Sequence, residues 1–182
     1  CQTYDVSQLL HHGGNVLALL LADGWYRGQV GMARAADQFG TDLAVRLQLQ
    51  ISGDAGWTVV AATDEKWATS LSHITAADLI GGQREDRRLL AASIHDPAYD
   101  HSAWSPAIRR DVDVAIVAPT APPVRRIEQI RPVAVTPVDA TDALIVDLGQ
   151  NINGWIRLSG LGPEGTHITL RHGETLDATG DL

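Results

Sequence analysis

The chain has 182 residues, of which 45% are hydrophobic and 20% charged, the composition of a globular protein with enough apolar side chains for a core. Its net charge of -8 at pH 7 argues against a nucleic-acid partner, because a phosphate-binding surface needs an excess of Lys and Arg. The single cysteine, Cys1, excludes an internal disulfide framework and any CxxC metal site.

The N-terminal part begins with a predicted helical turn over 5–10, capped by Asp5 or Ser7, and a turn at 13–15. The only long apolar run follows, from Val16 to Ala22. Its seven residues suit a buried strand and fall far short of the roughly 20 that a membrane span needs, so no membrane partner is predicted. No signal-peptide pattern opens the chain, and its compartment, bacterial cytoplasm or outside, stays open.

The middle of the chain predicts hairpins. Residues 29–40 have no clean period, which indicates a long loop or a frayed helix. Alternation over 43–51 predicts a strand with one solvated face, the turn 53–56 follows it, and 57–62 returns as the partner strand. At 78–82 the residues favour a strand and then a turn.

A proline-rich run divides the chain. Residues 100–106 predict a surface turn held by a buried Trp104, and 112–118 predict one more strand. In the run 119–123, prolines fix φ and remove amide donors, so we place a domain boundary there, with domains 1–117 and 118–182. Further strands are predicted at 125–135, 143–148, 155–160 and 167–172. Short strands with regular turns and few helical patterns predict an all-β sandwich.

Short motifs rich in Gly, Trp, Asp and Asn follow one another in a fixed order along nearly the whole chain. They are Tyr4-Asp5-Val6, Gly14-Asn15-Val16, Asp23-Gly24-Trp25-Tyr26-Arg27-Gly28, Thr63-Asp64 with Trp67, Gly82 with Asp86 and Arg88, Trp104-Ser105-Pro106, Pro122-Pro123-Val124 and Gly149-Gln150-Asn151-Ile152-Asn153-Gly154-Trp155. In this order they resemble the bacterial α-L-rhamnosidases of glycoside hydrolase family 78. One departure stands out: Gln83 and Glu85 replace a carboxylate and an aromatic residue of the family pattern.

The resemblance implies a jelly-roll-like β-sandwich followed by part of a second β-sandwich, with an (α/α)6 catalytic barrel downstream of Leu182. It implies a non-catalytic accessory portion of an enzyme that hydrolyses terminal α-L-rhamnose from glycosides or polysaccharides by inversion. The expected partners are L-rhamnose-containing glycans and the chain's own downstream catalytic domain. We further expect the first domain to begin before Cys1, so that the isolated segment would expose a strand edge and self-associate. The alternatives are a stand-alone carbohydrate-binding module and a purely structural domain.

The sharpest candidate site is a carbohydrate-binding cluster of Asp23, Trp25 and Arg27, because an aromatic ring beside charged groups suits a sugar. Some family members contain a calcium-dependent rhamnose-binding module, so the resemblance also makes calcium a possible cofactor, with its ligands unknown. The competing interpretation is that Trp25 and Tyr26 pack under a loop while Arg27 pairs with an acid elsewhere.

No catalytic residue is predicted in this chain. Glu85 and Asp86 could suggest a glycosidase pair, but adjacent strand residues point to opposite faces and cannot flank one bond. The two arginines that follow them favour a solvated ion-pair cluster instead.

Overall fold

The computed structural model describes residues 1–122, 124–139, 141–178, 180 and 182; Pro123, in the proline-rich run, lies outside them. The described residues form two units, Cys1–Pro119 and Thr120–Leu182. Within the described part of the chain, the strands make four two-stranded antiparallel sheets, three in the first unit and one in the second. Helix there is limited to three short turns: η1 (Ser7–Leu9), α1 (Gly24–Arg27) and η2 (Arg87–Leu89).

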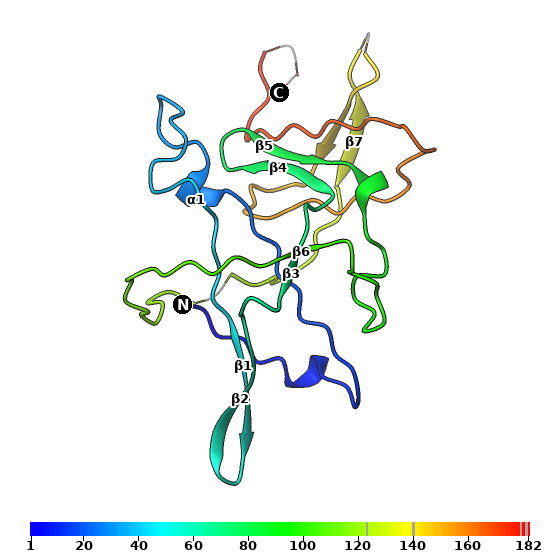
Figure 1. The fold of residues 1–182 in the computed structure, drawn as a ribbon. Coiled ribbons are helices and arrows are strands. Elements are labelled where there is room, and N and C mark those ends of the chain that lie inside the picture. Colours follow the sequence, from blue (N-terminus) through cyan, green and yellow to red (C-terminus); the bar gives the residue numbers. More distant parts are fainter. Residues whose placement is uncertain (123, 140, 179, 181) are drawn as a thin grey trace. The chain divides into compact units, whose positions relative to one another are not determined.

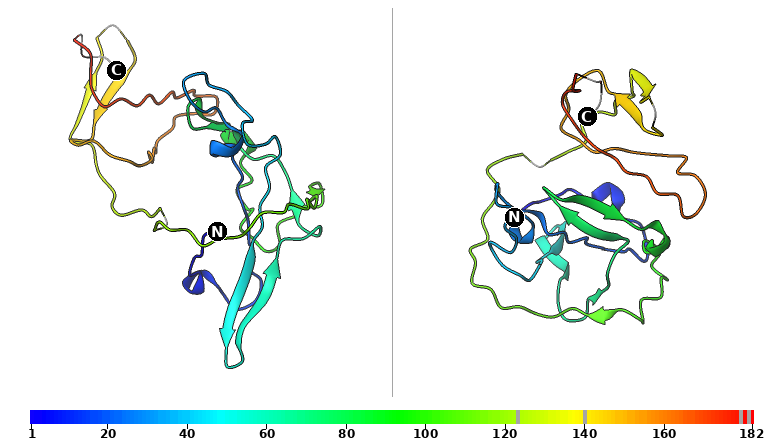
Figure 2. Two further views of the ribbon diagram at one scale, coloured as in Figure 1. Left: turned by 90° about the vertical axis from the view of Figure 1, so that its left-hand side faces the viewer. Right: turned by 90° about the horizontal axis from the view of Figure 1, so that it is seen from above.

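The β1–β2 hairpin follows the predicted alternation. Strand β1 (Gln48–Gly53) pairs with β2 (Gly56–Ala62) around a tight turn in which Gly56 has a φ of 99°, and a bulge lies between Leu49 and Gln50. Backbone bonding extends the pairing by one step, since the Thr63 N–H donates to the Leu47 carbonyl at 3.0 Å. The hairpin points away from α1 and from the strands β4 (Ile74–Asp78) and β5 (Gly82–Glu85) (Figures 1 and 2). The prediction that the strand begins at residue 43 is wrong, because the ladder starts only where β2 faces it.

A second hairpin pairs β4 with β5. The predicted order of strand and then turn at 78–82 is confirmed, but the strand ends at Asp78, the turn covers 79–81 and Gly82 already begins β5. The turn closes on the Asp78 carboxylate, whose Oδ1 accepts the Ile80 N–H at 2.8 Å. The short pair β3 (Ala68–Thr69) and β6 (Ser105–Pro106) brings two distant segments of the unit together.

The second unit contains β7 (Ala134–Pro137) and β8 (Leu144–Asp147), paired from Ala134 with Asp147 to Pro137 with Leu144. The strand predicted at 143–148 is confirmed, whereas the one predicted at 125–135 starts only near the end of that range. After β8 the chain turns at Gly149, which has a φ of 73° and whose N–H donates to Asp147 Oδ1 at 2.7 Å.

Four predicted strands are wrong: 16–22, 112–118, 155–160 and 167–172 contain no strand in the described structure. The apolar pattern of these segments predicts extended backbone, but a strand also needs a neighbour to complete its hydrogen bonds. Trp104 is half-buried rather than buried, and its ring packs edge-on against Tyr99 with centroids 5.9 Å apart.

Burial is slight throughout. Among the described residues Gly28 alone is buried, and none of the hydrophobic side chains is. On β2, for example, Trp57 is 72% exposed. Apolar sheet faces are therefore left uncovered, although such faces normally supply the main stabilisation of a sheet. No helix in the described part is long and apolar enough to cross a membrane.

Candidate functional site

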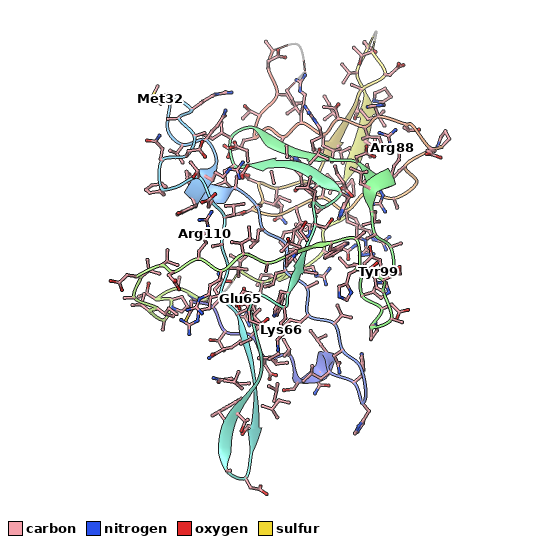
Figure 3. All side chains as sticks on the ribbon, viewed as in Figure 1. Met32, Glu65, Lys66, Arg88, Tyr99 and Arg110 are labelled. Carbon is pink, nitrogen blue, oxygen red and sulfur yellow. The ribbon has the colours of Figure 1, made fainter. Side chains whose placement is uncertain are left out.

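The candidate cluster is built on α1, a single helical turn. The Arg27 N–H donates to the Asp23 carbonyl at 3.1 Å, and Gly24, which opens the turn, has a φ of 52° that favours glycine. The loop 29–40 then folds back onto this turn: the Asp37 N–H donates to the Arg27 carbonyl at 2.9 Å, and the Phe39 N–H to the Tyr26 carbonyl at 3.3 Å. Met32, at the outer end of this loop, is fully exposed (Figure 3).

Asp23 and Arg27 meet on one side of the turn. Their i, i+4 spacing places Arg27 Nε 3.4 Å from Asp23 Oδ1, and the same nitrogen lies 3.8 Å from Asp37 Oδ1. All three side chains are substantially exposed, so each pair contributes at most about 1 kcal/mol to stability. The guanidinium is thus held at the surface between two carboxylates.

The structure does not bring Trp25 into the same group. Trp25 lies two residues from both Asp23 and Arg27, and residues at this spacing do not face each other on a helix. Its ring is 65% exposed, so it is not packed under a loop. The competing interpretation expected Arg27 to pair with an acid and the two aromatic rings to pack under a loop. Arg27 does pair with acids, and Tyr26 is half-exposed with its ring close to Gly40.

A cleft of about 280 Å³ lies beside α1. One wall comes from residues 20–23 and Arg27. The other comes from Ser72 and, on the β4–β5 hairpin, from residues 74–77 and Gln83. Asp23, Arg27, Ser72, Thr75 and Gln83 bring polar groups to a lining that is otherwise apolar. Such a mixture suits a small ligand that has both hydroxyl groups and an apolar face.

Sequence reasoning missed Asp78 as a residue of this region. Its carboxylate accepts three backbone N–H groups, from Gly81, Gln29 and Ile80. The hydrogen bonds from Gly81 and then Gln29 lower the pKa of Asp78 most. Desolvation opposes them, and the bond from Ile80 and the charge of Arg34 lower the pKa further by smaller amounts. An Asp before a Gly-rich turn does indicate bonds to the next two or three residues. The bond to Gln29, 49 positions away, has no such local signal.

The residues weighed as a catalytic pair form the predicted ion-pair cluster. Glu85 Oε1 lies 3.6 Å from Arg87 Nη1 and 3.6 Å from His73 Nε2, while Asp86 Oδ2 lies 2.6 Å from Arg88 Nη2. Arg88 lies at the end of β5, on η2 (Figure 3).

Metal binding has no support from the α1 turn itself. The described residues contain no group of three or more His, Cys, Asp or Glu that could hold a metal ion. Asp23 and Asp37 both face the Arg27 guanidinium, whereas calcium requires six to eight oxygen ligands. The donor set at this turn therefore fits a hydroxylated ligand better than a calcium ion.

Two family models match the chain in order. Residues 1–128 match the α-L-rhamnosidase N-terminal domain, and residues 139–182 match the bacterial α-L-rhamnosidase concanavalin-like domain. The fold and these matches define the chain as an N-terminal domain followed by a concanavalin-like domain, both of β-sandwich class. The chain belongs to the α-L-rhamnosidase family, as its motifs suggested. The predicted boundary after residue 117 stays a prediction.

Individual relatives agree. The chain is 35% identical over its whole length to an α-L-rhamnosidase of Streptomyces avermitilis, and 29% identical over 96% of its length to one of Alteromonas sp. (strain LOR). It spans only 18% and 19% of these relatives. A crystal structure of the Streptomyces avermitilis α-L-rhamnosidase complexed with L-rhamnose is similar over 88% of this chain and 16% of that one, with a TM-score of 0.78 and 33% identity. This likeness confirms the predicted all-β sandwich class.

Proposed function

We propose that residues 1–182 are a non-catalytic accessory portion of an enzyme that hydrolyses terminal α-L-rhamnose from glycosides or polysaccharides, with the catalytic barrel downstream. The observation that carries this proposal is the ordered match to an N-terminal domain and then a concanavalin-like domain, within about a fifth of the length of the relatives. The chain's own downstream catalytic domain is its proposed partner.

The state of the acidic residues supports a non-catalytic role. A glycosidase holds two carboxyl groups on either side of one bond, roughly 5 Å apart in retaining enzymes and 6.5–9.5 Å apart in inverting ones. Glu85 and Asp86 are instead adjacent in sequence and paired with Arg87 and Arg88. Their charges are engaged at the end of a hairpin, and neither residue lines the cleft.

Activity of the longer enzyme tests this placement. In the protein that contains this segment, the double variant Glu85→Gln, Asp86→Asn should hydrolyse p-nitrophenyl α-L-rhamnoside with kcat within about twofold of wild type. A loss of about 100-fold or more, in a variant with an unchanged circular dichroism spectrum, would place the chemistry in this segment and overturn the proposal.

Within this portion we propose a contact to L-rhamnose-containing glycans at Asp23, Trp25 and Arg27. Asp23 and Arg27 line the cleft and offer an acceptor and donors to hydroxyl groups, while the Trp25 ring, which lies outside this lining, is exposed and offers a face for stacking. Titration calorimetry of the longer enzyme with L-rhamnose, first with calcium and then with excess chelator, should lose one binding site per chain in Trp25→Ala. Unchanged stoichiometry in this variant would leave the segment as a scaffold.

The stand-alone carbohydrate-binding module remains the second candidate, because the exposed Trp25 would serve it equally well. The two functions differ in the gene: a reading frame that continues for the length of a barrel after residue 182 supports the enzyme, and an early stop supports the module.

A further inference from the structure

The two walls of the cleft come from segments about 50 positions apart, and one carboxylate joins them. Asp78 Oδ2 accepts the N–H of Gln29 at 2.6 Å, just beyond α1. Asp78 Oδ1 accepts the N–H groups of Ile80 and Gly81, which close the β4–β5 turn. Asp78 directly follows Ala77, the last lining residue of its strand, and Gln29 lies two positions after Arg27. The junction therefore lies at the edge of the cleft.

Gly28 makes this close approach possible. Its φ of -67° is ordinary for any residue, so the requirement for glycine here is one of space rather than conformation. A Cβ at this position would overlap the Gly24 carbonyl oxygen and lie 2.8 Å from Asp78 Oδ2. Among the described residues, Gly28 is also the only one that is buried. The α1 turn and the hairpin thus meet through backbone and one carboxylate, with no room for a side chain.

We propose that Asp78 and Gly28 form a junction that positions Asp23 and Arg27 in the cleft for a single sugar ring, so that Asp78 is a positioning residue for sugar binding. This inference rests on the sugar contact proposed above. Arg27 ends the four-residue turn α1 and Asp23 directly precedes it. No residue of this turn is buried, so its placement against the other wall depends on specific bonds. A hydrogen bond from the Gln29 N–H to the Asp78 side chain links the segment after α1 to the hairpin.

A purely local role for Asp78 would involve only Ile80 and Gly81, as in an ordinary Asx turn. Asp100 provides that comparison, because its Oδ1 accepts the Ser102 N–H at 2.9 Å and it caps a turn within its own segment. Asp78 differs in using its second oxygen for a distant backbone N–H. An asparagine at position 78 has only one acceptor oxygen. Its NH₂ group would therefore face the N–H of Gln29 or those of Ile80 and Gly81, and that set of hydrogen bonds would be lost.

Site-resolved hydrogen exchange of the full-length protein tests the junction. In Asp78→Asn, exchange across residues 20–40 should be at least tenfold faster, while residues 48–62 on the β1–β2 hairpin should be unchanged. The L-rhamnose concentration that half-protects residues 20–29 should rise at least tenfold. Asp100→Asn is the matched control and should change neither quantity.

A second pair of variants guards against a general folding defect. Gly28→Ala should reproduce both effects with Asp78 intact, while Gly53→Ala, whose Cβ would meet nothing within 4 Å, should show neither. If L-rhamnose does not change the hydrogen-exchange rates of residues 20–29 in the wild type, the sugar contact itself is refuted. The exchange rates measured without the sugar would then still test whether the junction exists. If Asp78→Asn and Gly28→Ala match their controls in both measurements, the junction is refuted.

Discussion

The contact between Tyr26 and Gly40 gives a perturbation whose size follows from the geometry. Gly40 has a φ of 155°, and a Cβ there would overlap the Tyr26 hydroxyl oxygen and lie 2.6 Å from Cζ and 2.9 Å from Cε1 of its ring. In Gly40→Ala the ring must therefore move by about 1 Å to reach normal contact. We expect the overlap to cost about 1–3 kcal/mol and the unfavourable φ about 1–3 kcal/mol more.

A double-mutant cycle separates these two costs. In a Tyr26→Ala background the overlap disappears and only the backbone cost of Gly40→Ala remains. The coupling free energy between the two positions should therefore be about 1–3 kcal/mol. The measurement is the free energy of local opening from hydrogen exchange of the Phe39 amide, which donates to the Tyr26 carbonyl at 3.3 Å. Gly53→Ala is the control for a glycine in open space.

The refuting result is a Gly40→Ala cost that is the same with and without the Tyr26 ring. That outcome would mean that loop 29–40 does not pack on the α1 turn in solution. The candidate site would then lack the support that the fold gives it.

Two further predictions concern single carboxylates. Asp86 accepts the Arg88 N–H at 3.1 Å and pairs with the Arg88 guanidinium. Asp86→Ala should therefore destabilise the η2 turn by about 1 kcal/mol, measured by hydrogen exchange of the Leu89 amide. Asp86→Asn keeps an acceptor for the Arg88 N–H and should recover most of this loss, because an exposed ion pair contributes little. Bonds from Gly81 and Gln29 lower the pKa of Asp78, so its contribution is complete above the unfolded value of about 3.9 and is lost as pH falls through the lower folded value. The measurement is the hydrogen-exchange protection of residues 29–40, corrected for intrinsic exchange and compared with residues 48–62. In wild type this protection should stay constant from about pH 7 to about pH 4 and fall at lower pH. Constant protection down to about pH 2, or the same fall in Asp78→Asn, would contradict the assignment.

The features that the sequence determined are those whose cause lies within a few residues. The β1–β2 hairpin was readable because alternation over 43–51 and a Gly-rich turn act locally, and β2 follows as the returning partner strand. The same holds for the turn after Asp78, where an Asp oxygen accepts neighbouring backbone N–H groups. The sequence grouped Asp23 and Arg27 with Trp25 because charged groups stand beside an aromatic ring, but the helical turn on which Asp23 and Arg27 meet came only from the structure.

The tertiary structure decided the features that depend on a distant partner. The apolar run 16–22 has the composition of a strand, but without a neighbouring ladder it stays irregular, and its residues 20–22 line one wall of the cleft instead. Trp25 belongs to the same motif as Asp23 and Arg27 yet lies outside that lining, because the helical turn directs it elsewhere. The bond between Asp78 and Gln29 spans 49 positions, and hydrogen-bond partners at such separations are set by the fold rather than by any local pattern.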